Sequence, residues 1–201
     1  LEDKYFEYVR NGGHLSLTMR SGIKDDTNIN MTDREIPGRL ADLAGIEVLD
    51  YDSLVSNSAK AQYRGKIYDI DVWSDLIHVT GTETEVLAEY ASEFYKGTPC
   101  MTANPYGKGA CIYIGTEPGE EMMKAVMKSI VSAAGIRALG RADDGVELMS
   151  RESRDTRWLF ALNHTNEERK YSIDGNYEQI YGDVAGTLRG YEVQIFKKTV
   201  K

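Results

Sequence analysis

Two cysteines and three histidines are the side chains of this 201-residue chain best suited to covalent or metal chemistry. They are Cys100, Cys111, His14, His78 and His164. A nucleophilic cysteine needs a neighbouring base and a tight turn that exposes its sulfur. Cys111 instead lies inside an apolar run with no G-x-C-x-G pattern, and Cys100 follows a proline with no histidine nearby. The histidines lack the close pairing from which zinc sites are built. We therefore predict structural or surface roles for all of them, and expect no catalytic residue, metal or cofactor in this chain.

Two loops partly match ligand-binding motifs. Residues 26–37 begin like a calcium loop, but Met31 stands where that loop requires glycine and Pro37 where it requires a bidentate glutamate. Gly107 and Gly109 lack the third glycine of a dinucleotide fingerprint and precede a predicted strand. The 32 acidic residues make chance pairs of carboxylates inevitable. We interpret the first segment as a solvated loop and the second as a turn, and assign no chemistry from these residues.

The predicted fold is organised around residues 104–135. Residues 104–109 combine a proline with two glycines, which indicates a turn. Residues 110–114 are almost wholly apolar, which is typical of a strand buried on both faces. Residues 115–119 break that strand, and a helix is predicted from Glu120 onward. The apolar residues at helical spacing are Met123, Val126, Met127, Ile130 and Ala134. We expect this helix to cover the core strand.

The chain before that segment alternates helices with strands. Residues 1–10 fit a helix, 14–19 a strand, 37–45 a short helix and 46–50 a second strand. A polar loop rich in Asp and Asn connects the first strand to the short helix at residues 20–35. This order of elements indicates an α/β layer architecture.

The middle of the chain favours antiparallel strands. Alternation over residues 59–63 and 68–72, with a turn signal between them, predicts a hairpin. Residues 85–95 fit either a helix or a strand, and we favour a strand over residues 86–90. With residues 99–103 and the core strand, it would form an antiparallel meander at the sheet edge.

After Leu139 the pattern changes to short strand-like runs separated by turn signals. These runs are residues 146–151, 158–163, 171–173, 178–181 and 191–196. We predict two domains: an α/β domain over residues 1–139, and a small antiparallel all-β domain over residues 140–201, near the lower size limit for an independent core.

Composition and charge restrict the partners. A net charge of −8 argues against a nucleic-acid or anionic-membrane partner. No apolar run approaches the ~20 residues needed to cross a bilayer. No signal peptide opens the chain, so we expect a cytoplasmic protein. Leu1 falls inside a helical pattern, which indicates a chain cut from a longer protein.

Several short segments, in their order along the chain, resemble a known family. They are YVRNGGHL (8–15), TMRSGIKD (18–25), PGRL (37–40), LAGIEV (43–48), GTP (97–99), NPYGKG (104–109), YIGT (113–116) and FALNHT (160–165). The segments up to residue 116 resemble the middle, trimerisation domain of family 42 glycoside hydrolases, which are microbial β-galactosidases. The last segment resembles the core strand of the small C-terminal β domain of that family.

That resemblance implies a fold and a role. The middle domain would have a flavodoxin-like, class I glutamine amidotransferase-like three-layer fold, here N-terminally truncated and without the amidotransferase cysteine and histidine. The parent enzyme would be a homotrimeric, retaining β-galactosidase, whose galactoside substrate is hydrolysed by two glutamates of a TIM barrel absent from this chain. No residue of this sequence corresponds to either of those two glutamates. We therefore expect the chain to be inactive by itself and to serve trimer assembly and active-site shaping.

The polar loop at residues 20–35 is the predicted subunit contact. It leaves the carboxyl end of the first strand, the edge at which open α/β sheets place functional loops. It is either a solvated loop or a segment that docks on a neighbouring subunit, where its charges would pair with acidic groups. The candidate interface residues are Arg20, Ser21, Lys24, Asp25 and Arg34.

The sequence is also compatible with two other functions. An amidotransferase-like enzyme using Cys100 would need a late histidine, and none occurs between His78 and His164. A carbohydrate-binding β module would use aromatic rings of the second domain as stacking platforms. The candidate rings are Trp158, Tyr171, Tyr177 and Tyr181. Aromatic side chains at strand spacing are more often core or cross-strand pairs.

Overall fold

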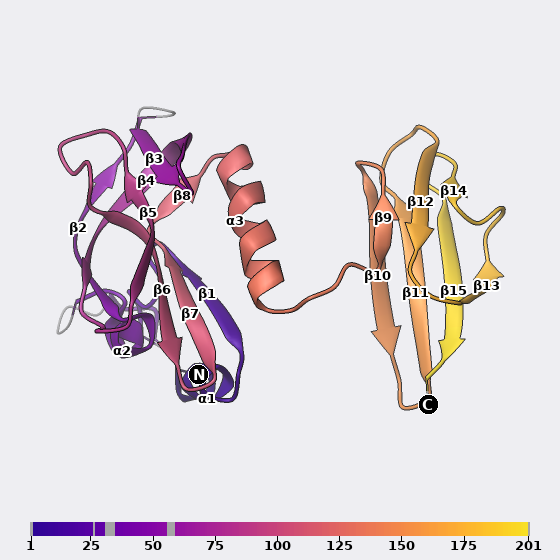
Figure 1. Ribbon diagram of the computed structural model, residues 1–201, viewed down its shortest axis with the longest axis horizontal. Helices are drawn as coiled ribbons and strands as arrows, with labels where there is room; N and C mark the ends of the chain where they lie inside the picture. Colours follow the sequence, from indigo (N-terminus) through magenta and orange to yellow (C-terminus); the bar gives the residue numbers. More distant parts are fainter. Residues whose placement is uncertain (1, 26, 31–34, 56–58, 201) are drawn as a thin grey trace. The chain divides into compact units, whose positions relative to one another are not determined.

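The computed structural model describes residues 2–25, 27–30, 35–55 and 59–200. The chain divides into two compact units, Leu1–Gly135 and Ile136–Lys201 (Figure 1). Each unit has its own sheet system and its own buried apolar core. Within the described ranges, no helix is both long and apolar enough to cross a membrane.

The first unit is a mixed sheet with helices on both faces. Its elements in chain order are α1 (Glu2–Arg10), β1 (His14–Thr18), a 3-10 turn (Gly38–Leu40), α2 (Ala41–Ala44), β2 (Ile46–Ser53), β3 (Ala59–Tyr63), β4 (Lys66–Val79), β5 (Glu85–Tyr90), β6 (Pro99–Tyr106), β7 (Gly109–Ile114), β8 (Thr116–Pro118) and α3 (Glu120–Ala133). The strand order is β1-β7-β6-β5-β3-β4-β2, and β8 pairs with β4. Among the strands described, only β1 and β7 run parallel.

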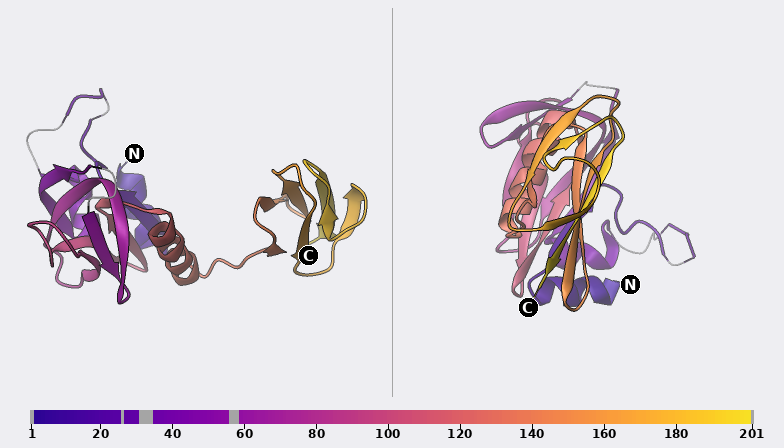
Figure 2. Two further views of the ribbon diagram at one scale, coloured as in Figure 1. Left: turned by 90° about the horizontal axis from the view of Figure 1, so that it is seen from above. Right: turned by 90° about the vertical axis from the view of Figure 1, so that its right-hand side faces the viewer.

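The core strand β7 divides the apolar interior into two layers, because successive side chains of a strand point to opposite faces. Cys111 and Tyr113 pack in the cluster that includes residues of α1 and α2. Ile112 and Ile114 pack in the other cluster, which includes residues of α3. The left view of Figure 2 shows the twisted sheet of the first unit. The predicted class, an α/β sheet followed by small antiparallel sheets, is confirmed.

Most of the predicted elements of the first unit are confirmed. The hairpin is β3 and β4, paired from Ala59↔Ile70 to Tyr63↔Lys66. The ambiguous segment is a strand, β5, and it forms a meander with β6 and β7. The short second helix ends at Gly45, whose φ of 66° is left-handed. A Cβ there would lie 2.2 Å from the Thr84 hydroxyl, so both backbone conformation and space favour glycine.

Three details of the predicted first unit are wrong. The meander is interior to the sheet, since β1 pairs with the outer side of β7 and β3 with the outer side of β5. The turn is shorter than residues 104–109, because β6 extends to Tyr106 and the Asn104 amide donates to the Leu43 carbonyl at 3.0 Å. The segment after β7 is also not a simple break. It forms β8, where the Thr116 hydroxyl donates to the Trp73 carbonyl at 2.7 Å.

The buried face of α3 differs from the predicted one. Met122 is completely buried beside Val126, whereas Met127 is 45% exposed. Tertiary contacts define this face: Met122 and Val126 pack in the apolar cluster under the sheet, and the Tyr63 hydroxyl donates to Ser129 Oγ at 2.8 Å. Helical spacing predicts an apolar face of the helix, but the part of the sheet that the helix packs against decides which side chains near that face become buried.

The second unit consists of two small antiparallel sheets. Its strands are β9 (Gly140–Ala142), β10 (Val146–Glu152), β11 (Thr156–Asn163), β12 (Arg169–Ile173), β13 (Glu178–Tyr181), β14 (Thr187–Leu188) and β15 (Val193–Thr199). One sheet has the order β10-β11-β15-β13 and the other β14-β12-β9. The sequence did not predict β9 or β14, which are only three and two residues long.

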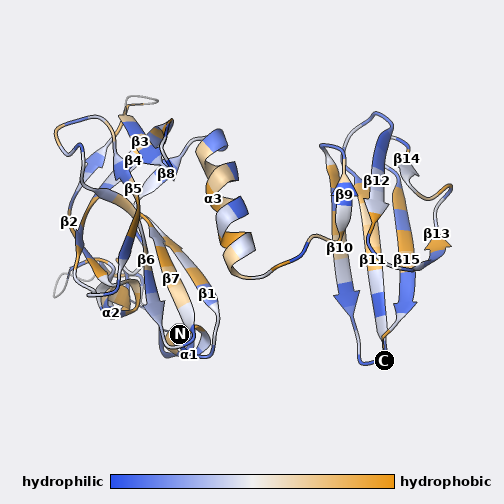
Figure 3. Ribbon diagram, viewed as in Figure 1, coloured by the Kyte–Doolittle hydropathy of each residue, from blue (hydrophilic) through white to orange (hydrophobic). Residues whose placement is uncertain are grey.

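The core of the second unit lies between these sheets. Leu159, Ala161 and Phe196 of the larger sheet meet Tyr171 and Leu188 of the smaller one. Figure 3 shows that β10 and β15 become hydrophilic toward one end. Apolar burial is therefore concentrated in a short central layer, and polar contacts must fix the loops around it.

Candidate functional site

A stack of three side chains, two of them exposed, forms beyond the carboxyl end of β1. The guanidinium carbon of Arg20 lies 5.1 Å from the centroid of the Trp73 ring. The Tyr51 ring lies against Trp73 with centroids 4.5 Å apart and planes inclined by 12°. We call these three residues the Arg20 stack. They come from the loop after β1, from β4 and from β2, so three separate segments meet here.

An irregularity in β4 positions Trp73. Val72 has a left-handed φ of 59°, which is unusual for a β-branched residue. The pairing of β4 with β8 shifts register between Asp71 and Ser74. Such a bulge re-aims side chains out of the regular alternation of a strand. Here Trp73 is half-buried over Tyr51, while Asp75 is buried beneath it.

Asp75 supports the stack from below. The residue is 2% exposed. Its carboxylate accepts hydrogen bonds from Trp73 Nε1 at 2.7 Å and from the Tyr113 hydroxyl at 2.8 Å. Burial raises the pKa of Asp75 above its ordinary value, although the two hydrogen bonds and the charge of Arg20 oppose this effect. The indole of Trp73 is therefore held in one orientation by a buried acceptor.

Two buried tyrosines complete this support. The Tyr90 hydroxyl lies 3.0 Å from the Asp75 carbonyl oxygen and 3.2 Å from that of Gly115. The Asp75 amide donates to the Gly115 carbonyl at 2.7 Å, which ties β4 to the end of β7. Burial raises the pKa of both Tyr90 and Tyr113, so their hydroxyls remain protonated donors.

The Arg20 stack is suited to binding rather than to catalysis. Tyr51 is 55% exposed, and Arg20 is exposed as well. Trp, Tyr and Arg are the residue types that dominate the binding energy of protein interfaces. Because Trp73 is already fixed by Asp75, little conformational entropy remains to be lost when a partner packs on it.

The predicted interface residues fall into two groups: some bond within their own loop, and Arg20 contacts a distant strand. Ser21 is half-buried, and its amide donates to the Thr18 carbonyl at 3.1 Å. Lys24 Nζ donates to the Asn28 side chain at 2.9 Å. These bonds lie within the loop and the end of β1, whereas Arg20 reaches out to Trp73. Arg34 lies outside the described residues.

Asp25 folds the loop locally. Its carboxylate accepts the Ile29 amide at 2.9 Å, the Thr27 amide at 2.9 Å and the Thr27 hydroxyl at 2.8 Å. The bond from Ile29 and those from Thr27 lower the pKa of Asp25. This is an Asx-type turn, in which a side chain satisfies backbone donors of its own loop. Of the described candidates, Arg20 is therefore the one that joins the stack.

Sequence reasoning missed Trp73, Tyr51 and Asp75. The available signal was a tryptophan between two aspartates at strand spacing, Asp71-x-Trp73-x-Asp75. The sequence predicts that Tyr68, Ile70 and Val72 alternate along one face, but Val72 is 50% exposed. The left-handed bulge ends that alternation, and local propensity does not predict a left-handed valine.

Both thiols are free and completely buried. Burial raises the pKa of Cys100 and of Cys111 to about 12. The thiolate is the nucleophilic form, so neither sulfur is activated at neutral pH. This agrees with the predicted structural roles and removes support from the amidotransferase-like alternative. No group of three metal-ligating side chains gathers within the described ranges.

Two protein-family models match this chain. Residues 1–137 match the β-galactosidase trimerisation domain, and residues 145–198 match the β-galactosidase C-terminal domain.

Curated relatives and solved structures agree with that result. The chain is 35% identical over 202 residues to β-galactosidase LacA of Lactobacillus acidophilus, with 98% of this chain and 30% of the relative covered. It is 36% identical over 183 residues to β-galactosidase LacZ of Heyndrickxia coagulans, with 90% of this chain and 27% of the relative covered. The crystal structure of a β-galactosidase from Bacillus circulans sp. alkalophilus superimposes with a TM-score of 0.83 at 28% identity, over 98% of this chain and 30% of that one.

This chain thus spans about 30% of the length of these relatives. Within this chain, the segment that matches the trimerisation domain precedes the segment that matches the C-terminal domain.

Proposed function

This chain belongs to family 42 of the glycoside hydrolases, and from that membership we propose that it assembles a β-galactosidase into its trimer. The observation that carries the proposal is the match of residues 1–137 to the trimerisation domain. The Arg20 stack supports it, because it offers a preorganised Arg–Trp–Tyr surface at the edge of that same domain.

We propose that the Arg20 stack contacts a neighbouring copy of the enzyme. The exposed side of the stack, formed by Tyr51 and Arg20 over Trp73, would pack against the neighbour, and the Arg20 guanidinium would face an acidic group there. Asp25 and Lys24 would shape the loop without entering the contact, since their side chains are engaged inside the loop. This arrangement would place the loop where it could help to wall the substrate cleft of the neighbour.

The assembly proposal is tested in a β-galactosidase of the relatives' length that carries this chain. Trp73→Ala should raise the dissociation constant of the trimer by about 30-fold or more, because a hot-spot ring contributes ~2 kcal/mol or more. Arg20→Glu should weaken the trimer most at low salt. Sedimentation velocity over a dilution series measures both effects.

Lys24→Glu is the matched control, since it reverses an exposed charge in the same loop outside the stack. It should leave the trimer nearly unchanged. An Arg20→Glu trimer as stable as the parent in both low and high salt would contradict the proposed contact.

We further propose that this chain contributes no catalytic carboxylate. In a β-galactosidase of this family, hydrolysis would be carried out by paired glutamates of a barrel domain. The trimerisation and C-terminal domains would then hold the barrels in place and shape their clefts.

The 201-residue chain should accordingly release no product from a chromogenic β-galactoside. The assay compares the purified chain with a full-length relative at equal molar concentration. Hydrolysis by the purified chain that a point substitution in the chain abolishes would overturn this part of the proposal.

A further inference from the structure

The loops around β13 and β15 form a concave surface on the second unit. This hollow has a volume of ≈ 550 Å³, within the size range of small-ligand sites. Its lining includes Tyr181, Asp183, Arg189, Tyr191 and Glu192. We call it the Tyr181–Tyr191 groove.

Two exposed rings border this groove. Tyr181 is 62% exposed and Tyr191 is 71% exposed. Tyr191 has a left-handed φ of 58°, a conformation uncommon for an aromatic residue, which the surrounding structure must hold in place. The faces of aromatic rings carry partial negative charge. They therefore attract the C–H groups that line one face of a pyranose ring.

Charged groups line the groove together with the two rings. Arg189 pairs with Asp183 at 3.1 Å, and both side chains remain exposed. The Glu192 carboxylate accepts the Arg189 amide at 2.7 Å and the Asp183 amide at 3.3 Å. Burial by itself would raise the pKa of Glu192. Hydrogen bonds from Gln194 and from these two amides outweigh that effect, so the pKa lies below its ordinary value and the group is ionised at neutral pH. Carboxylates accept hydrogen bonds from sugar hydroxyls, and a guanidinium donates to them.

Two amide side chains, buried Gln194 and half-buried Gln179, hold the loop of the groove. Gln194 is completely buried, and its Nε2 donates to the Thr187 carbonyl at 2.8 Å and to the Val184 carbonyl at 3.1 Å. Its Oε1 accepts the Tyr171 hydroxyl. Gln179 Nε2 donates to the Asp183 carbonyl at 2.9 Å. A loop fixed in this way loses little entropy when a ligand binds.

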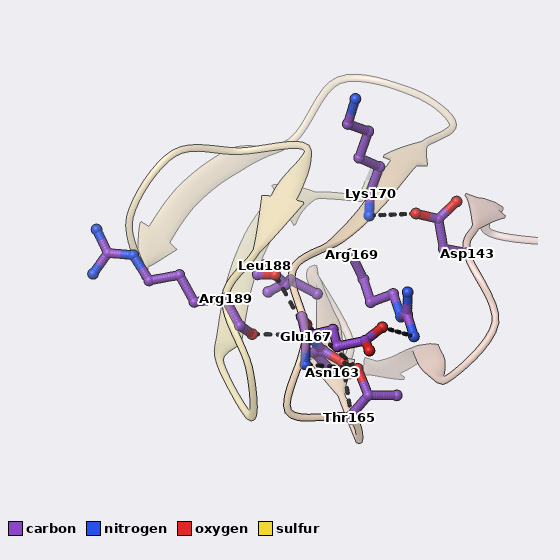
Figure 4. A network of polar contacts seen from close by, with 8 residues as sticks. All are labelled: Asp143, Asn163, Thr165, Glu167, Arg169, Lys170, Leu188 and Arg189. Carbon is purple, nitrogen blue, oxygen red and sulfur yellow. Dashed lines mark hydrogen bonds and ion pairs between the residues drawn. The ribbon is translucent and has the colours of Figure 1, made fainter.

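The side chain of Arg189 is exposed although it pairs with Asp183. Figure 4 shows its guanidinium pointing away from the Asn163 network, to which the residue contributes only its backbone carbonyl. The groove carries two acids and one base among Asp183, Glu192 and Arg189. This balance disfavours an anionic ligand such as a phosphate and favours a neutral one.

We propose that the Tyr181–Tyr191 groove binds a neutral oligosaccharide by stacking pyranose rings on the two tyrosines, and that the sugar is a β-galactoside chain. The choice of galactose rests on the proposed function. It has a chemical reason as well: an axial hydroxyl leaves one galactose face with a continuous apolar patch. The groove would hold a galactoside polymer close to the enzyme, away from the residues that cleave it.

This site corrects the carbohydrate-binding alternative derived from the sequence. Of its four candidate rings, Tyr171 is 8% exposed and bonded to Gln194, and Trp158 and Tyr177 are half-buried. Tyr181 is the one that presents an exposed ring to the groove. Tyr191 was missed, because its exposure depends on the left-handed turn that precedes β15.

The test is a titration of the 201-residue chain with β-1,4-galactotetraose, followed by heteronuclear NMR up to about 10 mM sugar. Saturable shifts are expected at residues of the groove. Tyr181→Ala or Tyr191→Ala should raise the dissociation constant by up to about tenfold each. Tyr191→Phe should bind like the parent chain, because it keeps the ring.

The matched control is Phe94→Ala, which removes an 84% exposed ring from the first unit and should not change binding. Cellotetraose, which lacks axial hydroxyls, should bind more weakly. Equal binding of cellotetraose would overturn the choice of a β-galactoside. Absence of binding, or binding that survives both alanine substitutions, would overturn the site. Neither result depends on trimer formation, so failure here is distinct from failure of the proposed assembly role.

Discussion

Replacing Asp75 by alanine should lower the free energy of unfolding of the first unit by about 3–5 kcal/mol. Trp73 Nε1 and the Tyr113 hydroxyl would both lose the acceptor that now lies 2.7 Å and 2.8 Å away. Tyr113 is completely buried, so water cannot easily replace the missing partner. Urea unfolding followed by Trp73 fluorescence measures the change, since the other tryptophan, Trp158, lies in the second unit.

Asp75→Asn is the matched control. It keeps one acceptor oxygen of nearly the same shape, and the Tyr113 hydroxyl can rotate to accept from the new amide. This variant should lose about 1 kcal/mol or less. A first unit that tolerates Asp75→Ala equally well would show that the buried carboxylate does not hold the stack.

The parent chain and the Asp75→Asn variant should differ in how their free energy of unfolding depends on pH. Burial raises the pKa of Asp75 above its ordinary value of 3.8, so the folded state keeps this proton to a higher pH than the unfolded chain does. The contribution of Asp75 to stability is therefore greatest in acid. It decreases as pH rises from about 3.8 through the raised pKa, and then stays level. Asp75→Asn should lack this segment of the stability–pH curve.

Replacing Asn163 by alanine should destabilise the second unit by about 2–4 kcal/mol. Asn163 is 4% exposed, and its amide donates to the carbonyls of Glu167 and Arg189 at 2.7 Å and 2.8 Å (Figure 4). Its side-chain oxygen accepts the Thr165 amide at 2.9 Å and the Thr165 hydroxyl at 2.8 Å. One side chain thus joins two loops, and a unit this small has little stability in reserve.

Two further variants separate the contributions of this amide. Asn163→Asp keeps the acceptor for Thr165 but loses the donor to the carbonyls, so most of the loss should remain. Thr165→Val removes one hydroxyl and should cost about 1 kcal/mol. Guanidinium unfolding followed by Trp158 fluorescence compares them. If the second unit of the Asn163→Ala variant were as stable as that of the parent chain, the apolar core alone would hold its loops, and the prediction would be wrong.

These polar anchors connect stability to the proposed functions. Asp75 orients Trp73, through which the trimer contact is proposed. Asn163 holds the Arg189 carbonyl, and Arg189 lines the Tyr181–Tyr191 groove. In the first unit a buried carboxylate holds the Trp73 ring against which Arg20 lies, and in the second unit a buried amide holds the backbone of Arg189. Loss of either anchor should therefore weaken binding as well as folding.

The sequence by itself determined the local elements of this protein. Alternating apolar residues predicted the β3–β4 hairpin, and the apolar run before Gly115 predicted β7 as a strand buried on both faces. The change from helix-and-strand order to short strands predicted an α/β sheet followed by antiparallel sheets. The burial of Cys111 followed from the same run. These features depend on periods of two or 3.6 residues, which a single segment contains.

Only the tertiary structure decided which segments meet. The Tyr113 hydroxyl bonds to the carboxylate of Asp75, 38 residues earlier in the chain. The Arg20 guanidinium, in the loop after β1, contacts Trp73 on β4. The buried stripe of α3, the pairing of β8 and the groove at Tyr191 likewise depend on the surface opposite each segment. A left-handed residue such as Val72 or Tyr191 is unfavourable locally, and packing elsewhere must compensate for it. Because that compensation comes from residues distant in sequence, no local pattern contains it.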